Sequence, residues 1–265
     1  MLSSPPVNTL KPLLKWAGGK RWLLPRLIEL WQPERGIRLV EPFMGSLSVA
    51  LGLRPNRALL NDANIHLVNL YRHLQQGLSV EIDMKNDRDF YYEMRTRFNQ
   101  LTRVEKYETS EAAQIFYYLN RTGFNGLCRF NNSGEFNVPF GKYKTINYAT
   151  DLSDYQATLQ AWDITVGDFE GLKLEPSDFI YADPPYDVQF TKYSQDDFTW
   201  EDQLRLTQWL AKHPGKVVLS NQATDRIVDL YQDCGFTIDI IDAPRRISCN
   251  GDRRPAKEVI ACKGF

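Results

Sequence analysis

The sequence predicts an α/β fold built on a parallel, doubly wound sheet. Short apolar runs typical of buried strands alternate with amphipathic segments typical of helices, both near the start of the chain and near its end. The 265 residues, 43% of them hydrophobic, can bury one large core and a small additional unit. Between about 80 and 160, aromatic-rich helical segments precede a stretch rich in glycine and asparagine. We expect this part to be a small, mainly helical insertion.

Each predicted element follows from the spacing of its apolar residues. In the first part of the chain these are a helix over 21–30, a strand over 37–41 that runs into a glycine turn, a helix over 46–53, a strand that ends at Asp62, and a helix over 65–78. The insertion contributes helices over 87–101 and 110–127. Strands are then predicted within 164–169, 178–186, 216–222, 236–243 and 257–264. The last two can pair as an antiparallel hairpin joined by the polar loop 244–255.

Composition favours some classes of protein over others. Residues 1–26 hold five lysines and arginines and no acid, residues 115–145 hold four and one acid, and residues 244–265 hold six and two acids. Any one of these segments could be ordinary solvated surface, but together they indicate one basic face that suits a nucleic acid. The formal net charge of −1 hides this distribution.

Membrane insertion, secretion and metal binding are disfavoured. No apolar run approaches the ~20 residues of a membrane span, and the N-terminal segment lacks the regions of a secretory signal. The wide spacing of the cysteines favours free thiols over a disulfide framework or a zinc site; they are Cys128, Cys234, Cys249 and Cys262. We therefore expect a cytoplasmic protein that uses no metal.

One predicted strand ends in an unusual way. The apolar run 179–182 is followed by Asp183, Pro184, Pro185 and Tyr186. Proline cannot donate to a strand ladder, and the residue before a proline is held in extended geometry. The strand must stop there, and the four residues form a stiff edge suited to chemistry. An ordinary turn that closes a core strand would explain the same residues.

Two other strand ends lie where an open parallel sheet binds ligands. Gly45 follows the first and lets the backbone approach a ligand closely, although the stretch lacks the three-glycine spacing of a dinucleotide fingerprint. Asp62 ends the second, where a carboxylate can hold a ribose diol or can simply cap the following helix. Before them, the loop 14–20 places paired glycines between Trp16 and Lys20, without the spacing of a phosphate loop.

Five motifs stand in a fixed order along the chain. They are KWAGGK (15–20), EPFMGS (41–46), NDAN (61–64), YLNRTGFNGLCRFNNSGEFNVPFGKY (118–143) and DPPY (183–186). In this order they resemble the Dam-type, D12-class adenine-specific DNA methyltransferases, and the resemblance covers nearly the whole chain. It implies a Rossmann-like sheet that binds S-adenosylmethionine without a metal, and methylation of the adenine amino group (N6) in duplex DNA by base flipping. GATC is the commonest target among similar relatives.

The resemblance also divides the chain and assigns its partners. It implies a first catalytic part that binds the cofactor (1–78), a target-recognition subdomain that binds DNA (79–160), and a second catalytic part with the DPPY motif and the C-terminal hairpin (161–265). We expect a monomer in solution, more than one copy of which can occupy one DNA molecule. The sequence leaves open whether the enzyme is solitary or belongs to a restriction–modification pair. Binding to DNA would associate it with the nucleoid.

Carried over residue by residue, the resemblance assigns the cofactor site and the catalytic residues. Cofactor contacts fall on Trp16, Lys20, Glu41, Pro42, Phe43, Gly45, Asp62, Asp168, Phe169 and Asp183. Of these, Asp168 and Phe169 are similar to the pair that holds the adenine ring of the cofactor. The catalytic residues are Asp183, Pro184, Pro185 and Tyr186.

The chemistry explains why the motif needs these residues. An adenine amino group is a poor nucleophile because its lone pair is delocalised into the ring. Asp183 can accept one amino hydrogen and the Pro184 carbonyl the other, which favours the developing ammonium of the transition state. Tyr186 is then free to stack on the base, which leaves the duplex at a cost of a few kcal/mol.

The stretch 115–145 suits DNA recognition, because cations meet phosphates or guanine edges while rings stack on bases. Core aromatics under a long loop would give the same composition. By resemblance, Phe124 wedges beside the flipped base with Asn125 next to it. Leu127 and Pro139 would contact thymine methyls, and Arg129 and Lys15 would read guanines. The DNA-binding set is completed by Arg121, Lys142, Tyr143, Arg253 and Arg254.

Two other classes of function stay open. A planar amide presents the same kind of nitrogen as adenine, so a methyltransferase acting on RNA adenine or on a protein glutamine amide is one alternative. Glutamine enzymes usually carry asparagine where Asp183 stands, and they would leave the basic insertion unexplained. The other alternative is a catalytically inactive DNA-binding regulator, against which the presence of Lys20, Asp62 and Tyr186 argues.

Overall fold

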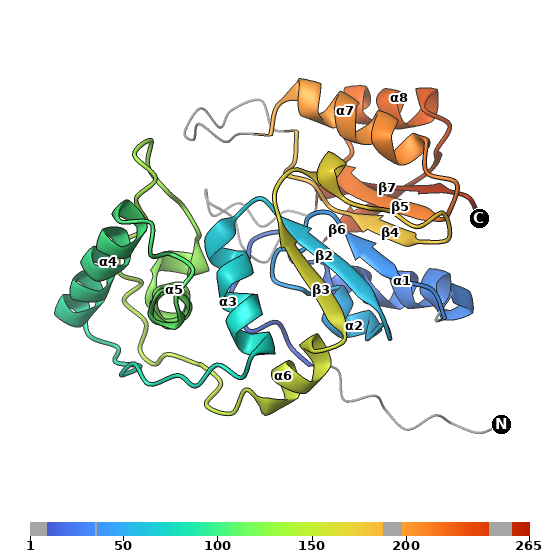
Figure 1. Cartoon of the computed structure of the whole chain (residues 1–265). Helices are drawn as coiled ribbons and strands as arrows, with labels where there is room; N and C mark the ends of the chain where they lie inside the picture. Colours follow the sequence, from blue (N-terminus) through green and yellow to red (C-terminus); the bar gives the residue numbers. More distant parts are fainter. Residues whose placement is uncertain (1–9, 35, 188–197, 244–255) are drawn as a thin grey trace.

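A seven-stranded sheet organises the part of the chain that the computed structural model describes, residues 10–34, 36–187, 198–243 and 256–265 (Figure 1). Its order is β3-β2-β1-β4-β5-β7-β6. The strands are β1 (Leu39–Glu41), β2 (Ala58–Asp62), β3 (Trp162–Val166), β4 (Phe179–Ala182), β5 (Val217–Gln222), β6 (Thr237–Ala243) and β7 (Ala256–Lys263). Strands β1 to β5 are parallel, and β7 pairs antiparallel with β5 and β6. The predicted fold class and the antiparallel pairing of the last two strands are confirmed.

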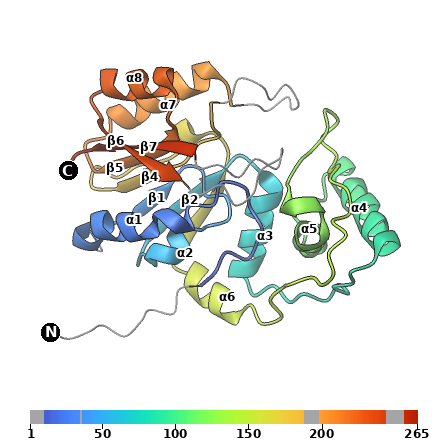
Figure 2. The ribbon, with the colours of Figure 1, turned by 180° about the vertical axis from the view of Figure 1, so that it is seen from behind.

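Helices cover both faces of this sheet (Figures 1 and 2). They are α1 (Leu24–Trp31), α2 (Ala50–Leu53), α3 (Ile65–Gln75), α4 (Arg88–Arg103), α5 (Ser110–Thr122), α6 (Ser153–Leu159), α7 (Trp200–Ala211) and α8 (Asp225–Asp233). In β4, Phe179 and Tyr181 join a core with α1, α2 and α3, whereas Ile180 and Ala182 join a second core with α7 and α8. Both faces of the central strands are therefore buried, as a parallel sheet requires.

Several predicted boundaries are wrong, each for a local reason. The first strand begins at Leu39, because Ile37 closes a turn with Glu34. The helix predicted over 46–53 is reduced to α2, because Leu47 has a φ of 58°, which a right-handed helix cannot contain. The helix predicted over 110–127 ends where Gly123 takes an extended conformation. Strand β3 begins at Trp162, before the predicted 164–169.

The sequence analysis predicts no helix at the positions of α6, α7 and α8, and this prediction is wrong. The start of α7 carries a capping box, in which the Thr199 hydroxyl accepts from the Asp202 amide and the Asp202 carboxylate accepts from the Thr199 amide. This signal is readable in the sequence. The omission matters because α7 and α8 bury one whole face of β4 and β5.

The order of the strands places three motifs at one edge of the sheet. The chain runs outward from β1 through β2 to β3 and then returns to the other side of β1 with β4. Open α/β sheets bind ligands beyond the carboxyl ends of their strands at such a reversal. The turn after β1, Asp62 at the end of β2 and the DPPY motif after β4 all lie there.

The two inserted helices lie beside the sheet. Helix α5 packs against α3, and α4 packs against α5, so the two inserted helices extend the molecule to one side of the sheet (Figure 1).

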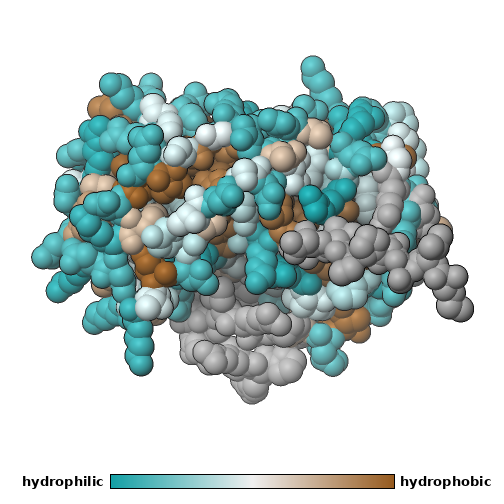
Figure 3. All heavy atoms as spheres, turned by 90° about the horizontal axis from the view of Figure 1, so that it is seen from below, coloured by the Kyte–Doolittle hydropathy of each residue, from teal (hydrophilic) through white to brown (hydrophobic). Residues whose placement is uncertain are grey.

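Seen from below, hydrophilic residues surround the outline of the molecule, and apolar side chains show in patches between them (Figure 3). Among the described residues, no helix combines the length and apolar character needed to cross a membrane.

Candidate active site

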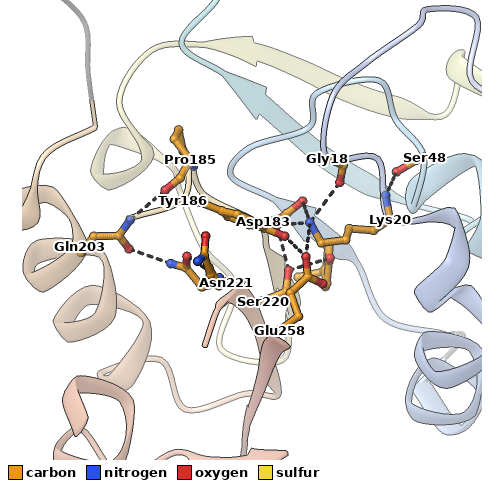
Figure 4. Close-up of polar contacts among 12 residues, drawn as sticks. Gly18, Lys20, Ser48, Asp183, Pro185, Tyr186, Gln203, Ser220, Asn221 and Glu258 are labelled. Atoms are coloured by element: carbon orange, nitrogen blue, oxygen red, sulfur yellow. Dashed lines mark hydrogen bonds and ion pairs between the residues drawn. The ribbon is translucent and has the colours of Figure 1, made fainter. Parts of the chain in front are cut away.

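The central contact of the site is an ion pair between Lys20 and Asp183 (Figure 4). Lys20 Nζ donates to the two carboxylate oxygens of Asp183 at 2.7 and 2.8 Å and to the Gly18 carbonyl at 3.0 Å. These contacts use all three donors of the ammonium group. Lys20 is only 1% exposed. Because a buried charge is tolerated only beside an opposite charge, each partner holds the other in place.

Among the described residues, one acceptor position of Asp183 has no partner. The hydroxyl of Ser220, within β5, donates to Asp183 Oδ1 at 3.0 Å and shares a 2.9 Å hydrogen bond with the Tyr181 hydroxyl. A carboxylate offers about four acceptor positions, and Lys20 and Ser220 occupy three of them. Among the described residues nothing takes the last position, so the site can accept one further hydrogen, such as that of an amino group.

The rest of the DPPY motif is fixed by α7 and β5. Gln203 Nε2 donates to the Pro185 carbonyl at 2.8 Å, and Asn221 donates to Gln203 Oε1 at 3.1 Å (Figure 4). No donor from the described part of the chain reaches the Pro184 carbonyl. The motif therefore presents a second acceptor besides Asp183, on a backbone that neighbouring side chains hold still.

Tyr186 turns toward β7, where it meets a residue that the sequence analysis did not identify. Its hydroxyl donates to Glu258 Oε1, and Lys20 Nζ lies 4.8 Å from its ring centroid. Burial raises the pKa of Glu258 to about 7, with a further increase from Asp183 and a decrease from Lys20. The one available signal was an acid inside the apolar strand 257–264.

The turns after β1 and β2 are built around Asp62. Its carboxylate accepts from the amides of Gly45 at 3.0 Å and Asn64 at 2.9 Å, and burial raises its pKa. Gly45 has a φ of 46°, and a Cβ there would lie 3.0 Å from the indole nitrogen of Trp16. The cap of α3 is Asn64, which accepts from two amides of the first turn. Asp62 therefore organises the turn and does not cap the helix.

Further predicted positions surround this turn. Glu41 is buried, its Oε1 has no partner among the described residues, and burial raises its pKa. The ring centroids of Phe43 and Phe169 lie 5.8 Å apart. Asp168 is held by two hydrogen bonds from Arg205, which lower its pKa, and the same guanidinium lies 4.5 Å from the Phe169 ring centroid. The sequence analysis did not identify Arg205.

Asn61 is a third residue of the site to which the sequence analysis assigns no role. Its side chain donates to the carbonyls of Pro42 at 3.1 Å and Gly167 at 2.9 Å, and accepts from Thr165 at 3.0 Å. It therefore ties together the ends of β1, β2 and β3. A buried amide that satisfies its hydrogen bonds in this way rigidifies the floor of the site.

Most of the predicted DNA-contacting residues lie on one loop that folds back on itself. Isolated antiparallel bridges join Gly123 to Phe140 and Phe130 to Phe136. Phe124 is 46% exposed, whereas Phe136 is buried. The aromatic residues of this stretch therefore serve both surface and core. The exposed predicted positions on the loop are Phe124, Asn125, Arg129, Pro139 and Lys142, and Leu127 is half-buried.

Lys15 joins this loop to the cofactor motif. The Asn120 side chain accepts from the Lys15 amide at 2.8 Å and donates to the carbonyls of Lys15 at 2.8 Å and Gly126 at 3.3 Å. Lys15 Nζ donates to the Arg121 carbonyl at 2.9 Å and lies 3.6 Å from the Tyr143 ring centroid. Burial and the neighbouring Arg121 lower the pKa of Lys15 to about 8. Asn120 was not identified from the sequence.

The remaining predicted positions take different places. Arg121 is half-buried and donates to the Leu13 carbonyl at 3.3 Å, and Tyr143 donates to the Gly123 carbonyl at 2.9 Å. Arg253 and Arg254 lie outside the described residues. Within the described ranges, no three His, Cys, Asp or Glu side chains gather as a metal ion would need.

Comparison with known proteins places this geometry in a family. The model of the D12 class N6 adenine-specific DNA methyltransferases matches residues 16–247. The chain is 35% identical over 277 residues to a DNA adenine methylase of Haemophilus influenzae, covering 96% of this chain and 94% of that protein. It is 34% identical over 257 residues to a type II methyltransferase of Lactococcus lactis subsp. cremoris, covering 89% of each.

A longer relative shows the same likeness. The chain is 36% identical over 264 residues to a DNA N-6-adenine-methyltransferase of Escherichia phage P1, covering 92% of this chain and 34% of that protein. The chain thus spans about a third of the phage protein, whereas it spans most of the other two. The chain belongs to the D12 class of N6 adenine-specific DNA methyltransferases.

Proposed function

We propose that this enzyme methylates the adenine of GATC in duplex DNA, and that this adenine leaves the helix stack to reach the DPPY motif. The observation that carries the proposal is the free acceptor position on Asp183, a carboxylate held by Lys20 and Ser220 at the end of β4. An adenine inside the duplex cannot bring its amino group to such a buried strand end, so extrusion of the base is required. The expectation of GATC comes from the motif resemblance.

In this mechanism Asp183 and the Pro184 carbonyl each accept one amino hydrogen. Together they favour the tetrahedral, developing ammonium over the planar amine, so their interaction strengthens in the transition state. Lys20 fixes the direction of the carboxylate before the base arrives, and orientation of this kind contributes to the rate. Tyr186 stacks on the face of the base. When bound, S-adenosylmethionine would supply the methyl group: its sulfur–methyl bond would break as the nitrogen–methyl bond forms, the sulfur would depart as a neutral thioether, and the methylated nitrogen would release one proton.

The residues at the ends of β1 and β2 fit that cofactor. The orphaned Oε1 of Glu41 and the carboxylate of Asp62 are acceptors for its ammonium and hydroxyl groups. Gly45 brings backbone close, and the rings of Phe43 and Phe169 provide an apolar surface for its base. We place the remaining cofactor contacts on Trp16, Lys20, Pro42, Asp168 and Asp183.

We assign target recognition to the loop 123–143 together with Lys15. Arg129 is exposed, and Asn137 accepts from its Nε at 2.7 Å and from its Nη2 at 3.5 Å, so Nη1 has no partner among the described residues and the edge formed by Nη1 and Nη2 can still donate. Such a fork suits the two acceptors of guanine in the major groove. We assign Phe124 as the residue that wedges beside the extruded base, because it is exposed at the turn that Asn125 completes with a φ of 52°.

The proposal is tested by methylation of defined substrates. Purified protein with labelled cofactor should label a GATC duplex and leave a duplex with one changed base unlabelled, and DNA from expressing cells should resist nucleases blocked by GATC methylation. Equal labelling of both duplexes would overturn the GATC assignment. Labelling of RNA or of a glutamine peptide, but not of duplex DNA, would overturn the substrate. Tight DNA binding without labelling would identify an inactive regulator.

A further inference from the structure

Glu258 on β7 is a buried carboxylate that the reaction described above does not use. It is 6% exposed and lies between Lys20 and Tyr186 (Figure 4). Its Oε1 accepts from the Tyr186 hydroxyl and lies 3.7 Å from Lys20 Nζ. Its Oε2 is buried and has no hydrogen-bond partner among the described residues.

The contacts of Lys20 limit what it can offer to Glu258. Its three donors are taken by Gly18 and the two oxygens of Asp183, so it attracts Glu258 without donating a hydrogen bond. The Tyr186 hydroxyl is therefore the single donor that Glu258 meets in the described part of the chain. Since the buried carboxylate has lost its hydration, this bond is stronger than it would be in water.

Tyr186 is consequently fixed at two ends. Its backbone follows Pro185, whose carbonyl is bound by Gln203, and its hydroxyl is bound by Glu258. A ring tethered at both ends has few orientations to lose when a base stacks on it. Among the described residues, the Lys20 ammonium pairs with two carboxylates, those of Asp183 and Glu258.

We propose that Glu258 is a positioning residue for methyl transfer, which holds the Tyr186 ring in the orientation that receives the target adenine and helps to keep Lys20 on Asp183. The proposal rests on the proposed role of Tyr186 as the stacking partner of that base. It acts through Tyr186 and Lys20 and makes no contact with the substrate.

A pH dependence follows from the same contacts. The titratable groups that face Glu258 are Lys20, Asp183, Tyr181 and Tyr186. The ionised form of Glu258 is the better acceptor for the Tyr186 hydroxyl. With a pKa of about 7, this form is present above neutral pH and is lost as the pH falls. We therefore expect kcat to rise as the pH passes through about 7 and to level off above it.

The test compares Glu258→Ala, Glu258→Gln and Tyr186→Phe with the double variant Tyr186→Phe/Glu258→Ala. We expect Glu258→Ala and Tyr186→Phe each to lower kcat by about tenfold. The KM for DNA and the KM for the cofactor should change little, because the lost hydrogen bond orients the Tyr186 ring and does not bind either substrate. The double variant should lose no more than Glu258→Ala, since the two side chains act as one unit. Glu258→Gln keeps an acceptor without a charge, so its kcat should lack the step near pH 7.

A matched control is Lys257→Ala, the preceding residue of β7, whose exposed ammonium pairs with Asp242. It should leave kcat and its pH profile unchanged. The proposal is overturned if Glu258→Ala keeps kcat within twofold, if the two single losses multiply in the double variant, or if Glu258→Gln keeps the step. If Glu258→Ala does not fold, Glu258→Gln and Tyr186→Phe still decide. If Asp183→Asn loses activity and Glu258→Ala keeps full activity, only this inference is rejected. If Asp183→Asn keeps its activity, the proposed active site itself is rejected.

Discussion

The DPPY edge and the recognition loop differ in what holds their side chains. At the DPPY edge, Asp183 and Tyr186 are fixed by residues far away in sequence, such as Lys20 and Glu258. On the loop 123–143, Phe124 and Arg129 are exposed. The loop backbone is held by contacts within the loop, such as that from the Phe124 amide to the Pro139 carbonyl, and by side chains of the neighbouring helices α4 and α5, such as Asn99 and Asn120. On the proposed assignments, methyl transfer would rely on side chains fixed across the sheet, whereas target choice would rely on exposed side chains of a loop that the inserted helices hold in place.

Asp183 gives the largest expected effect. We expect Asp183→Asn to lower kcat by about 10³-fold on every duplex, because it removes a charged acceptor from the transition state. Single-turnover methylation with labelled cofactor measures this, and near-ultraviolet circular dichroism checks the fold. Ser220→Ala is the matched control, because it removes one neutral hydrogen bond to the same carboxylate and should cost about tenfold or less. A kcat within tenfold of the unmodified enzyme in Asp183→Asn would break the comparison.

Asn120 tests the connection between the two regions. We expect Asn120→Ala to lower the free energy of unfolding by about 1–3 kcal/mol, because three backbone groups of Lys15 and Gly126 lose their partner. Binding of cofactor and of DNA should weaken together, since the loop 14–20, which contains Lys15, also carries Trp16 and Lys20. Urea denaturation and calorimetric titration measure both. Asn132→Ala, an exposed position of the same segment, serves as the control. An unchanged stability would show that the regions are independent.

Arg129 sharpens the assignment of the loop to target choice. We expect Arg129→Ala to cost about 1–3 kcal/mol of binding on the GATC duplex and much less on a scrambled duplex. Lys142→Ala should instead weaken binding to both duplexes and reduce the salt slope by about one. Fluorescence anisotropy at two salt concentrations separates the two outcomes. Equal losses on both duplexes for Arg129→Ala would contradict its role as a base reader.

Lys15 gives the smallest effect, which depends on pH. Its lowered pKa of about 8 means that the ammonium is present below that pH and is lost above it. DNA affinity should therefore stay level below pH 8 and fall above it by up to about tenfold per pH unit. Lys15→Gln should bind more weakly at all pH values and lack the step. The same step in Lys15→Gln would assign the titration to another group.

Much of the fold follows from sequence pattern alone. The ends of β2 and β4 fall where apolar runs meet Asp62 and Asp183, because burial on both faces of a parallel strand demands an unbroken apolar run. Pattern failed where backbone conformation is decided one residue at a time, as at Leu47 with its positive φ. It also failed for α7, although the capping box at Thr199 is a local signal.

The sequence by itself determined the parallel α/β class, the family, and the motif residues that end its strands. Only the tertiary structure decided that Lys20 meets Asp183 across 163 positions, that Asn120 joins the Lys15 loop to Gly126, and that Glu258 holds Tyr186. The physical reason is the separation along the chain of the residues that interact. Strand and helix signals arise from neighbours along the chain, whereas the partner of a buried charge is set by strand order, which no local pattern encodes.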